Sequence, residues 1–243
     1  MSNIQVLKRD GTVEELNLEK VHKMVEFAVE GLAGVSASQV EIQSGLQFCD
    51  GITSNDIQEI LIRSASDLIT EDNPNYQYVA ARLLLFGLRK AVHGHPEILP
   101  PLRQHVERCI DKGVYDSTIV NRYSEEEWDR INSFVDHERD YLFTYAGLRQ
   151  VVDKYLVQDR STGEHYESPQ QMYIMIAVTL FANYPKETRL DYVQRYYNAI
   201  SRHKINIPTP IMGGVRTPIR QFASCVLVDI DDTLDSIFSS DMA

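Results

Sequence analysis

The chain has 243 residues, 43% of them hydrophobic, which is enough for one large or two ordinary globular domains. Lys and Arg number 24 against 35 Asp and Glu, a formal net charge of −11. This acidic balance argues against general nucleic-acid binding, although a local basic cluster could still bind a single nucleotide. The N-terminus lacks an apolar signal region and no apolar run is long enough to span a bilayer, so we expect a cytoplasmic protein.

The N-terminal part predicts a β-hairpin followed by helices. Residues 4–16 contain two short strands around an Asp-Gly pair, which is a strong signal for a tight turn. Asn17 is a good helix cap, and Ser36 and Thr53 each begin a capping-box pattern. The expected helices cover about residues 17–30, 36–48, 53–68 and 75–92. A stretch rich in histidine, glycine and proline at 93–101 then breaks the helical pattern and predicts a domain boundary.

Residues 102–202 predict a mainly helical second region. The expected helices cover about 102–112, 124–134, 144–155, 169–183 and 188–201, with a small hairpin inside 154–167. The helix at 169–183 is apolar on nearly all sides, so it should lie at the centre of this region. His137 to Asp140 form a charged run, for which we favour a solvated turn over a contact with substrate.

The C-terminal part predicts a strand that the chain cannot pair. Phe222 to Ile230 is apolar and rich in β-branched residues, which is typical of a strand buried on both faces. Its N–H and C=O groups need neighbours, and only residues 205–207 offer a short companion. Asp232 is a candidate cap for a final helix that starts at Thr233. We therefore expect a second polypeptide to complete the sheet, and residues beyond about 205 to behave poorly without it.

The three cysteines show no metal-binding spacing and no Cys-x-x-Cys pair. No metal is expected in this chain. In a reducing compartment the default is three free thiols. The helical surroundings of Cys49 and Cys109 favour buried, inert thiols, and the residue pattern alone favours the same for Cys225.

Three C-terminal motifs carry a specific resemblance. They are PTPIM at Pro208–Met212, VRTPxRQFxSCV at Val215–Val226, and DxLDSI at Asp232–Ile237. The chain resembles the large (alpha) catalytic subunit of class I ribonucleotide reductase at the start of its ten-stranded α/β barrel. The resemblance implies an α+β, mainly helical fold, made of an ATP-cone regulatory domain, a helical domain and the first strand and helix of an incomplete barrel. The implied domain ranges are 1–95, 96–204 and 205–243.

The N-terminal motif VLKRDG at Val6–Gly11 resembles the ATP cone, which binds ATP or dATP as an allosteric effector. Lys20 falls in the first turn of a helix, where a cation is unfavourable unless an anion binds nearby; from spacing alone a solvated surface lysine is the simpler interpretation. Gln58 and Gly87 stand where the family often has histidines, so inhibition by dATP is expected to be weak. The resemblance assigns effector binding to Lys8, Arg9, Glu14, Asn17, Lys20, Ser54 and Lys90.

For the catalytic part, the resemblance makes Cys225 one of the redox-active thiol pair. Thr209, Ser224 and Cys225 would contact substrate, and Asp232, Thr233 and Leu234 would border the specificity-effector site. The implied partners are a downstream polypeptide that completes the barrel, a small subunit that carries the radical cofactor, a second large subunit, and thioredoxin or glutaredoxin. Two alternatives are a free-standing nucleotide-sensing module without catalysis and a structural helical adaptor.

Overall fold

The computed structural model describes residues 4–45 and 47–242. Strands β1 (Gln5–Leu7) and β2 (Val13–Glu15) form the predicted antiparallel hairpin, in which Gln5 is opposite Glu15. Gly11 has φ 84°, the left-handed conformation that the turn requires. A third strand, β3 (Ile52–Thr53), pairs parallel to β1 and gives the order β2-β1-β3. It has two residues, too few to show a periodic pattern in the sequence.

The N-terminal helices are α1 (Leu18–Val29), α2 (Ala37–Gly45), α3 (Ser54–Asp67) and α4 (Tyr76–His93). Asn17 caps α1 by accepting the Lys20 N–H at 3.0 Å, and Thr53 forms the predicted capping box with Asp56. The capping box expected at Ser36 is replaced by a tertiary contact. The Tyr76 hydroxyl accepts the Ser36 N–H at 3.0 Å and donates to Gln39 Oε1 at 2.5 Å.

The second domain contains α5 (Leu102–Asp111), η1 (Val120–Arg122), α6 (Glu125–Phe134), η2 (His137–Leu142), α7 (Tyr145–Gln150), η3 (Val151–Tyr155), β4 (Gln158–Asp159), β5 (Glu164–His165), α8 (Pro169–Phe181) and α9 (Lys186–Ser201). The helix predicted at 144–155 is divided, because its last turn widens into the π-helical η3. Helix α8 is buried on nearly all sides and packs on α9, which confirms its central place.

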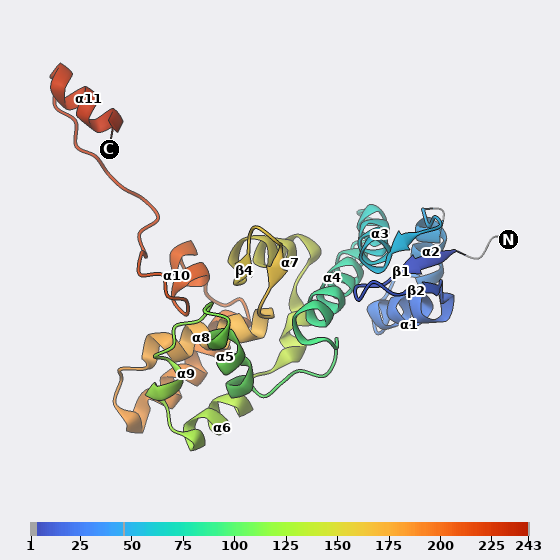
Figure 1. The fold of residues 1–243 in the computed structure, drawn as a ribbon, viewed down its shortest axis with the longest axis horizontal. Helices are drawn as coiled ribbons and strands as arrows, with labels where there is room; N and C mark the ends of the chain where they lie inside the picture. Colours follow the sequence, from blue (N-terminus) through green and yellow to red (C-terminus); the bar gives the residue numbers. More distant parts are fainter. Residues whose placement is uncertain (1–3, 46, 243) are drawn as a thin grey trace.

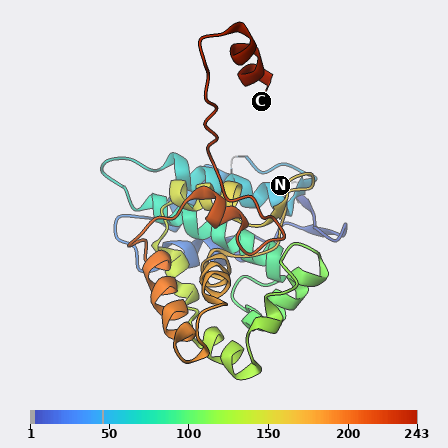
Figure 2. The ribbon, with the colours of Figure 1, turned by 90° about the vertical axis from the view of Figure 1, so that its left-hand side faces the viewer.

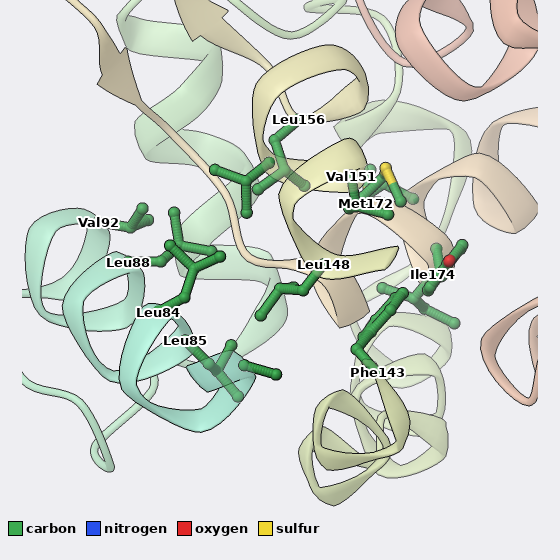
Figure 3. Packing of buried hydrophobic residues seen from close by; sticks show 14 of the residues in the cluster. Leu84, Leu85, Leu88, Val92, Phe143, Leu148, Val151, Leu156, Met172 and Ile174 are labelled. Atoms are coloured by element: carbon green, nitrogen blue, oxygen red, sulfur yellow. The ribbon is translucent and has the colours of Figure 1, made fainter. Parts of the chain in front are cut away.

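One hydrophobic cluster runs through both domains. Helix α4 packs on α1 and α3 of the N-terminal domain and on α7 of the second. Figure 3 shows its side chains Leu84, Leu85 and Leu88 facing Leu148 and Leu156. Helix α4 is therefore shared by the two cores, and Figure 1 shows it between them.

The charged run at 137–140 is not a solvated turn. In η2, Asp140 is buried and pairs with the buried Arg89 of α4, at 2.8 Å between Nη2 and Oδ2. Burial of Asp140 is possible because Gln170 Nε2 donates to its second oxygen at 2.9 Å. The sequence prediction was wrong here because the partners are distant in sequence.

The predicted strand Phe222–Ile230 and its companion at 205–207 are not strands in this structure. Residues 223–233 leave the body as an extended segment that ends in α11 (Leu234–Met242), as Figures 1 and 2 show. Leu227 is 99% exposed. A strand is stabilised by ladder hydrogen bonds and burial, and no described residue supplies either to this segment. The cap of α11 is Thr233 rather than Asp232, since Thr233 Oγ1 accepts the Ser236 N–H at 3.2 Å.

The body ends instead with a short helix, α10 (Thr209–Gly214), and an anchored turn. Arg216 is completely buried and pairs with the completely buried Glu167 just before α8. Of the cysteines, Cys109 is buried as predicted, whereas Cys49 is exposed in the loop after α2, against prediction. Among the described residues, no helix combines the length and apolarity that a membrane crossing needs.

Candidate functional site

A cavity of about 390 Å³ opens between the β1–β2 hairpin and helices α1, α3 and α4. Six of the seven residues assigned to effector binding line it: Lys8, Glu14, Asn17, Lys20, Ser54 and Lys90. The seventh, Arg9, lies beside it and donates from Nε to Asn55 Oδ1 at 2.7 Å. These residues come from four parts of the fold: the hairpin, the start of α1, the start of α3 and the end of α4. The fold therefore brings together residues that are up to 82 positions apart (8 to 90).

The cavity is locally basic on an acidic chain. Four lysines line it against two glutamates. Glu14 accepts hydrogen bonds from Lys8 Nζ at 2.8 Å and from Lys20 Nζ at 3.4 Å, and the first of these is the main cause that lowers the pKa of Glu14. Partial desolvation, and then the charges of Arg9, Lys8 and Lys20, lower the pKa of Lys90. The cations thus repel one another, and a bound anion would relieve that repulsion.

The cavity lining also contains large apolar side chains. They include Phe27 of α1, Ile57 of α3 and Phe86 of α4. A cavity lined by both lysines and aromatic rings suits a ligand with an anionic part and a flat, weakly polar part. The N-terminus of α1 adds backbone N–H groups and a favourable dipole to the cavity.

Gln58 and Gly87 fit each other at the wall of the cavity. The Gln58 Nε2 donates to the Leu83 carbonyl at 2.7 Å, which holds the side chain across α4. A Cβ placed on Gly87 would lie 3.0 Å from Gln58 Cγ. Gln58 therefore occupies the space that a larger residue at 87 would need, so the two departures from the family pattern act as a pair.

The sequence did not single out Phe27, Phe86 or Glu97, which also line the cavity. Phe27 falls off the buried stripe formed by Val21, Val25 and Ala28 on α1. An aromatic residue beside such a stripe was the available signal for a ligand-facing position. Glu97 lies in an irregular segment and carried no pattern.

The C-terminal candidates are dispersed. Thr209 begins α10, with its Oγ1 3.4 Å from the Tyr155 hydroxyl, while Ser224 and Cys225 are exposed on the extended segment. Asp232, Thr233 and Leu234 are exposed where that segment meets α11. The structure of this chain does not bring these residues into one site. Residues 4–45 and 47–242 also contain no group of three His, Cys, Asp or Glu side chains placed to hold a metal ion.

Two protein families match the chain. The ATP cone domain matches residues 4–91, and the all-alpha domain of ribonucleotide reductase matches residues 141–220. The chain therefore contains an ATP cone domain and a ribonucleotide reductase all-alpha domain within these ranges. The basic cavity lies wholly within the cone, apart from Glu97. The buried pair Arg216–Glu167 lies within the all-alpha domain.

Relatives extend the similarity over nearly the whole chain. The ribonucleoside-diphosphate reductase subunit alpha of Haemophilus influenzae is 53% identical over 97% of this chain. The reductase 1 subunit alpha of Escherichia coli is 52% identical over 99%, and the subunit alpha of Enterobacteria phage T4 is 41% identical over 98%. The chain spans 31–32% of the length of these relatives, so the similarity covers their N-terminal region only.

Proposed function

We propose that the cavity of the cone is an effector site for ATP or dATP, in the regulatory part of a ribonucleoside-diphosphate reductase alpha subunit. The observation that carries this proposal is the convergence of Lys8, Asn17, Lys20, Ser54 and Lys90 on one cavity. These residues come from four separate elements, and four lysines meet there on a chain of net charge −11.

The lysines and the aromatic rings of the cavity bind different parts of the nucleotide. The triphosphate lies among Lys8, Lys20 and Lys90 at the N-terminus of α1, where cations and backbone N–H groups both favour it. The base lies against Phe27 and Phe86. Without a ligand, Glu14 holds Lys8 and Lys20 in place through its hydrogen bonds, so part of the cost of ordering these long side chains is met before binding.

The catalytic role belongs to the whole protein of which this region is a part. In that reaction hydrogen replaces the ribose 2′-hydroxyl, which leaves as water, and a pair of thiols supplies the two electrons and is oxidised to a disulfide. Cys225 supplies one thiol, Thr209 and Ser224 contact the substrate, and Asp232 to Leu234 border the specificity-effector site. Completion of the barrel brings these residues together, and a small radical-generating subunit, a second alpha subunit and thioredoxin or glutaredoxin act as partners.

Calorimetric titration of the full chain with ATP tests the effector site. We expect saturable binding, and a loss of affinity of at least about tenfold in the double variant Lys8→Ala/Lys20→Ala, because two charge-assisted contacts are removed. The matched control is Lys112→Ala/Lys186→Ala, which removes two lysines from the second domain, outside the cavity. Unchanged affinity in the first variant would remove these residues from the site.

A further inference from the structure

The apolar wall of the cone cavity is also part of the contact between the two domains. Phe27 and Phe86 line the cavity, with ring centroids 6.4 Å apart. Phe27 also meets Tyr141 of η2 edge-on, at 6.0 Å between centroids. Tyr141 is therefore one side chain away from any ligand in the cavity.

The basic wall has a parallel connection through α4. Lys90 lines the cavity, and its neighbour Arg89 points to the second domain. Arg89 Nη2 donates to Asp140 Oδ2 at 2.8 Å and to the His137 carbonyl at 2.7 Å. The Arg89 and Arg82 guanidinium carbons lie 5.5 Å and 5.6 Å from the Tyr141 ring centroid. Two consecutive residues of one helix thus touch the cavity and the interdomain contact.

From Asp140 the contacts continue to the centre of the all-alpha domain. Gln170, at the start of α8, donates to Asp140 Oδ1 at 2.9 Å and accepts from the Tyr197 hydroxyl of α9 at 2.7 Å. The same hydroxyl accepts the Asp136 N–H at 2.9 Å. The Arg89–Asp140, Gln170–Asp140 and Tyr197–Gln170 hydrogen bonds are all buried, where hydrogen bonds are strong and their loss is costly. The network joins α4 of the cone to α8 and α9.

We propose that occupancy of the cone cavity and packing of Tyr141 against Phe27 are energetically coupled, so that a bound nucleotide stabilises η2 and α8 of the all-alpha domain. This inference rests on the proposed function of the cavity. Its physical basis is that a nucleotide base against Phe27 and Phe86 restricts the rings that support Tyr141. In a close-packed interior such a restriction reaches the next side chain.

The coupling must be reciprocal, because both effects share one thermodynamic cycle. Hydrogen exchange of the full chain with and without ATP measures one direction. We expect ATP to slow exchange in residues 137–142 and 169–181, outside the cavity. Titration of Tyr141→Ala with ATP measures the other direction, and we expect its affinity to fall by about fivefold or more.

Two controls separate coupling from general destabilisation. Tyr141→Phe keeps the ring and loses only a long 3.5 Å contact from Arg89, so it should bind ATP as the wild type does. Tyr166→Ala removes a partly buried tyrosine that also carries a cation, Lys112, over its ring, but lies away from the cavity. It should leave ATP affinity and the ATP-dependent exchange of 169–181 unchanged.

The outcomes distinguish the two proposals. A wild-type chain that does not bind ATP overturns the effector site, and the coupling with it. A wild-type chain that binds ATP, with Tyr141→Ala binding within about twofold of it, overturns only the coupling. Protection by ATP that is confined to residues 4–91 would also overturn the coupling and leave the effector site standing.

Discussion

Arg216 should be one of the most costly residues to replace in the all-alpha domain. It is fully buried, and its Nε donates to Glu167 Oε2 at 2.8 Å while Nη2 pairs with Oε1. Its remaining donors reach the Met212 carbonyl at 2.6 Å and the Tyr155 carbonyl at 3.1 Å. Arg216 therefore ties the end of α10 to the segment before α8. We expect Arg216→Met to free residues 205–217 and to destabilise the domain.

The size of the stability loss depends on the hydrogen bonds that Glu167 retains in the variant. Without Arg216, this fully buried carboxylate retains the Val157 N–H at 2.7 Å and the Tyr115 hydroxyl, but no positive partner. Breaking a buried ion pair by removing one member typically costs about 3–5 kcal/mol. Adding Glu167→Gln to Arg216→Met should recover part of that loss, because a neutral amide is less costly to bury than an unpaired carboxylate.

Urea unfolding followed by fluorescence of the single tryptophan, Trp128, measures this effect, since that residue is buried in α6. For an m-value of about 3 kcal/mol/M the midpoint should fall by about 1–2 M. The matched control is Arg220→Met, which breaks another arginine–carboxylate pair four residues on, with Asp116. Arg220 is 61% exposed, so the loss should stay below about 1 kcal/mol. Equal effects of the two variants would refute the reasoning.

Four further results are expected. Burial lowers the pKa of His93 to about 3, so as pH falls the unfolded chain takes up a proton before the folded chain does, and the free energy of unfolding decreases from pH 6.5 towards pH 3. His93→Gln should remove about 3 kcal/mol of this decrease between pH 7 and 4, measured by urea unfolding at several pH values. Gly87→Ala should gain about 1 kcal/mol of helix stability only when Gln58→Ala first clears its Cβ, and a gain in the single variant would contradict the 3.0 Å approach. In a complete reductase that carries this cone, dATP should inhibit activity only weakly, because of Gln58 and Gly87. Strong inhibition at micromolar dATP in an activity titration would contradict this prediction. In the same enzyme, Cys225→Ser should abolish multiple turnover with thioredoxin-type reductants, whereas full turnover would leave Cys225 an ordinary thiol.

Local signals predicted the elements that local interactions stabilise. Asn17 and Thr53 cap helices where the sequence places caps, because a capping side chain bonds a backbone group three residues away. The central position of α8 was predictable for a similar reason, because a helix that is apolar on all sides is expected to be buried on all sides. The family motifs also brought the cone's basic residues to notice before any geometry was known.

Where the deciding partner is distant in sequence, local signals gave the wrong answer. The sequence around Asp140 predicts a solvated side chain, but Asp140 pairs with Arg89, which lies 51 residues earlier. Ser36 was expected to form a capping box, but its N–H donates to the hydroxyl of Tyr76, 40 residues later. Phe222 to Ile230 has the composition of a buried strand but no neighbour among the described residues, so it stays extended and exposed.

The sequence by itself determined the helices with caps, the hairpin, the central apolar helix and the set of cone residues that bear charge. The tertiary structure alone decided that those charged residues share one cavity, that Phe27 and Phe86 also line it, and that Tyr141 contacts Phe27. The physical reason is the distance along the chain over which each kind of interaction acts. Caps and turns act over a few residues, whereas a cavity, a buried ion pair and a sheet depend on groups that only chain folding brings within contact distance.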